Sequence, residues 1–128
     1  MLIRADCLIH VLSIFMKIKA INIMGIIFHN GRLFVEDVTH EKIHSYQWFE
    51  FIPIGLALYV GTRSIPIALF GLFGFPILYV MNVLLNLCLY DTFQDAYRNT
   101  VFEREAYRNQ SNKEYLNKRV IFSWVNYI

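Results

Sequence analysis

Apolar and polar positions are distributed unevenly along this chain of 128 residues. Residues 48–90 are almost entirely apolar, and Glu50 and Arg63 are the only charged residues among them. Charged and polar side chains gather before and after this segment. A long apolar segment with one polar break, at Arg63, is typical of two helices that turn back on each other. The pattern therefore predicts a hydrophobic helical hairpin at about residues 48–90.

The two arms of this hairpin differ in length. The second arm, residues 67–90, has no charged residue and is long enough as a helix to span about 30 Å of hydrocarbon. The first arm has fewer apolar residues, and we expect Pro53 to bend it because proline has no N–H for the preceding turn. The hairpin is predicted to enter a membrane, either by crossing it or by dipping into it partway.

The segment before the helices reads as β-structure. Residues 16–35 alternate partly between apolar and polar, and Asn30 and Gly31 lie between the runs 26–28 and 32–35, which are apolar apart from Arg32. Asn-Gly between apolar runs is a strong signal for an antiparallel β-hairpin. The edge of such a sheet could hold an extended peptide by strand addition, or the hairpin could simply cover one side of a site.

The first fifteen residues form an apolar extension with two readings. They lack the clean apolar region and the cleavage site of a signal peptide. We interpret residues 1–15 either as a short interfacial helix or as a stretch upstream of a start at Met16. Residues 16–128 are expected to form a single domain.

The polar parts of the chain predict further helices. We expect a first helix from Asp37 to about residue 60, with acidic residues in its first turn, and a polar helix at residues 101–110. A further helical stretch is expected at residues 112–119, followed by an aromatic tail. The predicted fold class is mainly α with a small N-terminal antiparallel β-hairpin.

Composition and charge narrow the class of protein. Hydrophobic residues make up 56% of the chain and charged residues 17%, against about 45–50% and about 25% in typical soluble domains. The net charge of +2 is too small to predict a nucleic-acid partner. Eleven of the twelve Lys and Arg residues lie outside residues 48–90, and Arg63 lies at the predicted tip. The positive-inside rule then places both termini in the cytoplasm.

The candidate chemistry lies in one H-E-x-x-H string, which reads His40-Glu41-Lys42-Ile43-His44. Side chains at i and i+4 of a helix lie on the same face, so both imidazoles could bind one metal ion. The intervening Glu41 would then act as general base on a metal-bound water. The spacing predicts a Zn²⁺ site in which Glu41 is the catalytic residue.

The third ligand must come from elsewhere in the chain. Glu103 and Glu105 lie in the predicted polar helix after the hairpin, and they are two residues apart. Their side chains would point about 200° apart on that helix, so only one can face the metal. If the ion joins both sides of the apolar segment, the chain must leave and return on the same side of the membrane.

Several stretches of the sequence resemble small, mostly uncharacterised bacterial membrane proteins with a zincin-like H-E-x-x-H motif. The resemblance is carried by residues 39–44 with Gln47 and Glu50, and by residues 96–99 and 102–107. More distantly, the chain is similar to membrane gluzincin metallopeptidases. The resemblance implies a zincin-like helix pair, here joined by the hydrophobic membrane hairpin, in a bacterial inner membrane with the metal site on the cytoplasmic side.

The same resemblance implies a ligand set. In those gluzincins the third ligand is the Glu immediately before an Ala, which corresponds to Glu105. They usually have Asp after that Ala, where this chain has Tyr107. The role of that Asp beside the metal ligands could fall to Glu103, Asp37 or Asp95, and Glu103 is also the alternative ligand. Tyr107 could instead hydrogen-bond an oxyanion or pack as an ordinary aromatic residue.

Three functions fit these patterns. The first is a membrane-associated zinc metallopeptidase whose activated water attacks a peptide bond near the cytoplasmic membrane surface, with membrane lipid and a peptide or membrane protein as partners. The second is a zinc-binding membrane scaffold or interaction protein without turnover. The third is an apolar membrane protein in which the motif is accidental. The sequence indicates neither a substrate nor an oligomeric state.

Overall fold

The structure, a computed structural model, describes residues 1–5 and 20–128. The strands are β1 (Leu2–Arg4), β2 (Ala20–Ile23) and β3 (Ile26–His29). The helices before residue 90 are α2 (Val35–Phe49), α3 (Phe51–Thr62), α4 (Ile65–Ala68) and α5 (Phe70–Asn86). They are followed by α6 (Phe93–Arg98), α7 (Val101–Asn109), α8 (Tyr115–Lys118) and the 3₁₀ helix η1 (Ser123–Tyr127). The prediction of a mainly α fold with a small sheet is confirmed.

The sheet is mixed, in the order β1-β3-β2. Strands β2 and β3 form an antiparallel hairpin, and β1 pairs in parallel with β3. The hairpin turns at Met24 and Gly25, which both have positive φ angles of 51° and 82°, as the mirror-image turns of tight hairpins require. The predicted turn at Asn30 and Gly31 was wrong, because those residues lie in the connection that leads into α2.

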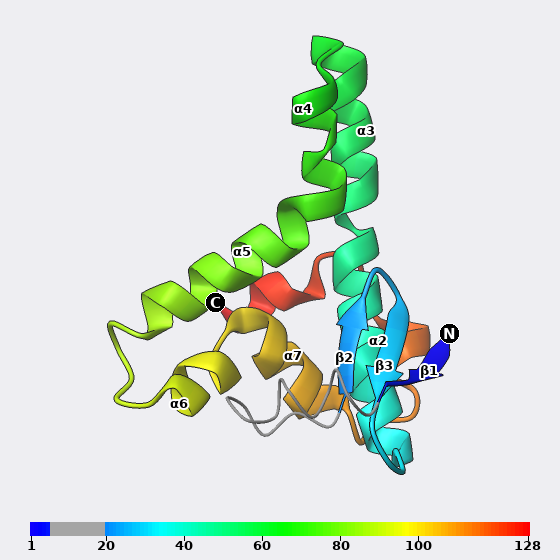
Figure 1. Cartoon of the computed structure of the whole chain (residues 1–128), viewed down its shortest axis with the longest axis vertical. Helices are drawn as coiled ribbons and strands as arrows, with labels where there is room; N and C mark the ends of the chain where they lie inside the picture. The colour runs from blue at the N-terminus through cyan, green and yellow to red at the C-terminus, as the bar shows by residue number, and fades with distance from the viewer. Residues whose placement is uncertain (6–19) are drawn as a thin grey trace.

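The sheet lies beside α2 (Figure 1), and the side chain of Asn22 forms hydrogen bonds with that helix. The amide of Asn22 on β2 donates to the backbone oxygen of Glu41 at 2.6 Å and to Ser45 Oγ at 2.7 Å. The same side chain accepts from the N–H of Gly25 and so closes the strand turn. The predictions for residues 1–15 and for a single domain at 16–128 stay predictions; residues 6–19 lie outside the described residues.

The apolar segment folds as a helical hairpin whose tip stands away from the rest of the protein (Figure 1). Helix α2 ends at Phe49, about one turn before Pro53, which has no N–H to donate to the Phe49 carbonyl. Helices α3 and α5 then pack closely through Gly55 and Gly71.

Within the described residues, none of the helices combines the length and the apolar character that crossing a membrane requires. The longest helix of the apolar segment, α5, has 17 residues. The predicted crossing of a membrane by residues 48–90 is therefore not supported. The chain breaks its helix at Arg63, in the left-handed region, and again around Leu69, so the apolar residues are divided among α3, α4 and α5.

The base of the hairpin belongs to the hydrophobic core. Buried aromatic and aliphatic residues from α2, α3, α5 and α7 meet there: Trp48, Phe51, Phe75, Val101 and Phe102. Two asparagines of α5 hold the following helices, since Asn82 accepts from the N–H of Val101 and Asn86 donates to the carbonyl of Ala96. These contacts hold α6 and the start of α7 against α5.

Candidate metal centre

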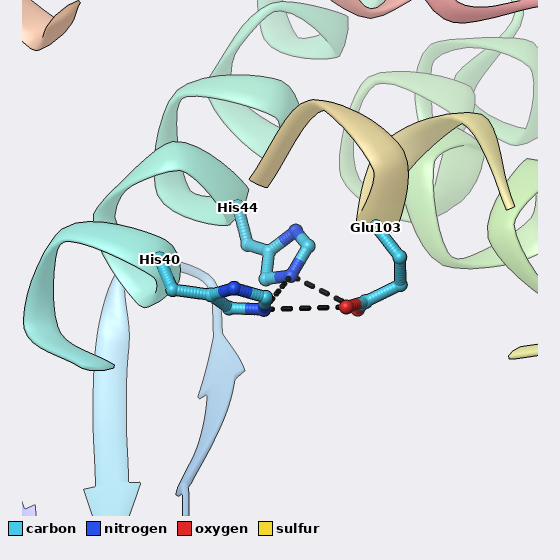
Figure 2. Close-up of side chains that lie close together, drawn as sticks. All are labelled: His40, His44 and Glu103. Atoms are coloured by element: carbon cyan, nitrogen blue, oxygen red, sulfur yellow. Dashed lines mark hydrogen bonds and ion pairs between the residues drawn. The ribbon is translucent and has the colours of Figure 1, made fainter. Parts of the chain in front are cut away.

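Helix α2 presents His40 and His44 on one face, and α7 packs against that face. The carboxylate of Glu103 on α7 points toward both imidazoles (Figure 2). All three residues are buried, with at most 8% of each residue exposed. The structure thus brings together two histidines and one acid that are separated in sequence by the whole apolar segment.

The distances in this cluster match those of a metal site. The Nε2 atoms of His40 and His44 are 3.1 Å apart, and Glu103 places Oε2 3.2 Å from His40 Nε2 and Oε1 3.0 Å from His44 Nε2. Tetrahedral zinc with bonds of about 2.0–2.2 Å separates its ligand atoms by about 3.3 Å. The three residues could therefore hold a metal ion, whose identity the geometry does not fix.

Two glutamines set the tautomers of the imidazoles. Nδ1 of His44 lies 2.7 Å from Gln47 Oε1, and Nδ1 of His40 lies 3.1 Å from Gln110 Oε1. A carbonyl oxygen only accepts, so each Nδ1 must carry the proton. In the neutral rings both Nε2 atoms then present lone pairs toward each other and toward Glu103, which is the arrangement a metal ion needs.

Without a metal, a proton has to supply the positive charge. Burial opposes a charge on His44, but the adjacent Glu103 carboxylate outweighs it and raises the pKa of His44 to about 9. Burial would raise the pKa of Glu103, yet the facing imidazoles of His44 and His40 hold it far below its usual range. Glu103 Oε2 is buried and accepts no hydrogen bond from the described residues. The arrangement of the three side chains therefore favours a positive charge among them.

Glu41 stands beside this cluster and is 8% exposed. Burial raises the pKa of its carboxyl, and the nearby His44 and His40 oppose that shift. Glu41 directly follows His40 on α2, and its carboxyl also interacts electrostatically with Glu103. A carboxyl in such a position has the proton affinity that suits a general base acting on water.

Helix α7 and helix α5 together orient Glu103. The hydroxyl of Thr100 accepts from the N–H of Glu103 and caps the start of α7. The hydroxyl of Tyr79 on α5 donates to Glu103 Oε1 at 2.6 Å. Thr100 therefore holds the backbone of Glu103, and Tyr79 holds its carboxylate.

Glu105, which the resemblance implied as the third ligand, lies elsewhere. Its carboxylate accepts from Arg119 Nε at 2.6 Å, from Tyr115 at 2.8 Å and from Gln47 at 2.9 Å. Because α7 rotates by about 200° over two residues, Glu103 faces the imidazoles and Glu105 faces the C-terminal segment. The acid that the structure brings to the two imidazoles is therefore Glu103 and not Glu105.

The other residues singled out in the sequence lie around the site or away from it. The ring of Tyr107 packs edge-on against His40 with centroids 4.6 Å apart. Asp37 accepts from the N–H of Phe34 at the start of α2, and Asp95 accepts from Thr92 in the exposed first turn of α6. Asp37 and Asp95 therefore serve the starts of these helices in the structure.

Three residues that contact the candidate ligands were not predicted from the sequence to do so: Gln47, Tyr79 and Gln110. Gln47 follows His44 by three positions on the same helix, so helical spacing could have found it. Tyr79 lies in the apolar segment, and Gln110 follows α7, where no local pattern links them to the motif.

No family model, curated protein or solved structure matches this chain. The likeness to small bacterial membrane proteins and to membrane gluzincins therefore stays a prediction from the sequence.

Proposed function

We propose that this protein is a zinc-dependent hydrolase that cleaves peptide bonds. The observation that carries the proposal is the meeting of His40, His44 and Glu103 at metal-ligand distances beside the carboxyl of Glu41. Two histidines and one carboxylate are the protein ligands of many catalytic zinc sites, and they leave a fourth position open.

Each residue has a defined part in the proposed reaction. His40, His44 and Glu103 hold the ion, which would lower the pKa of a water molecule at its open position and polarise the substrate carbonyl. Glu41 takes the proton from that water as it attacks the carbonyl carbon and passes it to the leaving amine. Tyr79 keeps the Glu103 carboxylate in place.

The test compares two variants of the metal cluster. We expect the purified protein to hold about one zinc ion, His44→Ala to lose it, and Glu41→Gln to keep it, because Glu41 is not a ligand. Cleavage of a library of fluorogenic peptides should fall at least about 100-fold in Glu41→Gln, the size of a lost general base. Equal cleavage by the wild type and Glu41→Gln would refute the hydrolase.

A zinc-binding protein without turnover is the second candidate, and the burial of the cluster favours it. His40, Glu41 and His44 are each only 7–8% exposed, and Glu103 is 0% exposed, which leaves little room for a substrate. The same experiment separates the two functions. One bound zinc in the wild type, with no peptide hydrolysed, would favour the binding protein.

We also propose that the hairpin of α3, α4 and α5 is a membrane contact, with lipid as the partner. The proposal is supported by large apolar side chains exposed along the hairpin: Leu56 (63%), Ile65 (66%), Phe73 (53%) and Leu84 (58%). The 12 residues of α3 are about 18 Å long, close to the depth of one leaflet, about 15 Å. A cytoplasmic side and a bacterial inner membrane remain part of this proposal.

Flotation with lipid vesicles tests this contact. We expect the purified protein to float with vesicles and Leu56→Gln/Ile65→Gln to stay largely in the soluble fraction, because both side chains lie on the hairpin. The matched control is Val35→Gln, which changes a residue of similar exposure, 68%, at the start of α2. Unchanged flotation of the double variant would count against the hairpin as the contact.

A further inference from the structure

One fully buried amide connects the candidate metal centre to the C-terminal segment. The side chain of Gln47 is 0% exposed and lies between α2 and α7. It accepts from His44 Nδ1 at 2.7 Å and donates to the Phe102 carbonyl at 3.1 Å and to Glu105 Oε2 at 2.9 Å. Both of its N–H groups and its carbonyl are therefore engaged.

The chemistry of this position admits few side chains. It requires one acceptor toward His44 and two donors toward a carbonyl and a carboxylate, which among the common side chains the amide of Gln or Asn supplies. A Glu at position 47 would bring a second carboxylate against Glu105, and an apolar residue would leave the Phe102 carbonyl and His44 Nδ1 without partners.

The Glu105 carboxylate, which accepts a hydrogen bond from Gln47, is bound in turn by Arg119. Arg119 donates to Glu105 through Nε at 2.6 Å and through Nη2 at 3.2 Å, and its Nη1 pairs with Glu50. The Arg119 side chain is 2% exposed. A continuous chain of hydrogen bonds thus runs from His44 through Gln47 and Glu105 to Arg119.

The other imidazole has a weaker counterpart. His40 Nδ1 lies 3.1 Å from the side-chain Oε1 of Gln110, which follows the end of α7 and is half-buried. Water can replace a partner at such a position more easily than in the interior. Gln110 is therefore the natural control for Gln47.

We propose that Gln47 is a positioning residue of the metal centre: it fixes His44 with Nε2 toward the ion, and the Glu105–Arg119 pair fixes Gln47. This inference rests on the proposed metal site. Glu105 then acts on the metal centre indirectly, by holding Gln47 in position.

Zinc affinity measured by competition with a chromophoric chelator tests the proposal. We expect Gln47→Leu, which keeps the size of the side chain, to bind zinc about 10–100-fold more weakly, as partners of metal-ligating histidines do when removed. Gln110→Leu should weaken binding less than about threefold, because water can take its place.

A second readout separates positioning from a merely structural role. In the zinc-loaded wild type, ¹H–¹⁵N spectra of the histidine rings should show a slowly exchanging Nδ1 proton on His44, and this signal should be lost in Gln47→Leu. Exchanging the two groups, as Gln47→Glu/Glu105→Gln, restores an acceptor for His44 and a donor between positions 47 and 105. We expect this double variant to bind zinc more tightly than Gln47→Glu alone.

The outcomes distinguish this inference from the proposed function. A wild type that binds no zinc overturns the metal site itself. A wild type that binds zinc, together with a Gln47→Leu variant of equal affinity and an unchanged His44 signal, overturns only the positioning role. If Gln47→Leu does not fold, the double variant decides, and no gain over Gln47→Glu overturns the role.

Discussion

Glu103 and Glu105 show how two residues of the same type acquire different chemistry. Both lie on α7 and both are 0% exposed. Glu103 faces two imidazoles and a tyrosine hydroxyl, whereas Glu105 faces the guanidinium of Arg119. A buried carboxylate needs a positive partner, and each of these two has its own. Their roles follow from the partner that each one meets.

This difference predicts different effects of the same substitution at the two positions. Glu103→Gln should lower zinc affinity at least about 100-fold, because it removes the only charged ligand. Glu105→Gln should lower it about tenfold or less but reduce the free energy of unfolding by about 1–3 kcal/mol, since Arg119 loses a buried counter-charge. Chelator competition and urea unfolding measure the two quantities. The reverse ranking in zinc affinity would restore Glu105 as the ligand.

The sequence could predict part of this site for a local reason. The spacing of His40 and His44 fixes their common face within one helix, and no other element is needed to know it. The choice between the two acids depends on Arg119, which lies 14 positions after Glu105 and reaches it only when the C-terminal segment folds back. Helical spacing alone left that choice open, and the likeness to gluzincins favoured Glu105.

At the scale of elements, the β-hairpin illustrates competition between two glycine turns. Gly25 and Gly31 both have positive φ angles, 82° and 66°, so both positions suit a turn. The strands close at Gly25 because Asn22 accepts from its N–H while also donating to α2. The signal at Asn30 correctly predicted a glycine turn between two strands, but that turn forms at Gly25. The contact of Asn22 with α2 that accompanies the turn at Gly25 is long-range, so no local pattern predicts it.

The helical hairpin depends on contact between two backbones, which gives a prediction for its glycines. A Cβ atom on Gly55 would lie 2.4 Å from Gly71 Cα and 2.6 Å from the Ala68 carbonyl oxygen. Backbone atoms cannot move aside without separating the helices, so Gly55→Ala should cost about 1–3 kcal/mol of unfolding free energy.

Gly61 provides the matched control for this prediction. It lies in the same helix, and a Cβ there would meet nothing within 4 Å. Gly61→Ala should leave stability unchanged or raise it by up to about 1 kcal/mol, because alanine favours the helix. Urea unfolding followed by far-UV circular dichroism compares the two variants. Equal stability of both would mean that α3 and α5 do not pack through Gly55.

At the scale of the whole molecule, the apolar segment has two roles that composition cannot separate. Its base contributes Phe51 and Phe75 to the core, and the indole N–H of Trp48 donates to the Leu72 carbonyl. Its tip and outer faces are exposed. The sequence does not show whether an apolar residue will pack in a core or contact lipid. The whole segment was therefore predicted as a membrane hairpin, although its base belongs to the core.

The C-terminal segment completes the molecule by neutralising two buried acids. Arg119 pairs with Glu105 on α7 and with Glu50, which lies between α2 and α3. Glu50 also accepts from the N–H of Phe122 and the indole of Trp124. The guanidinium of Arg119 therefore joins the C-terminal segment to α7 and to the junction between α2 and α3.

Arg119→Met should accordingly destabilise the whole fold by about 3–5 kcal/mol, because it leaves two buried carboxylates without their cation. Lys118→Met is the control, since the neighbouring side chain is 74% exposed and its pair with Glu114 is worth about 0–1 kcal/mol. Urea unfolding in the presence of a chelator keeps metal binding out of the comparison. If the two variants were equally stable, the C-terminal segment would not hold α2 and α7 together. A loss confined to Arg119→Met, restored in part by Glu105→Gln in the same chain, would trace the cost to the unpaired carboxylates.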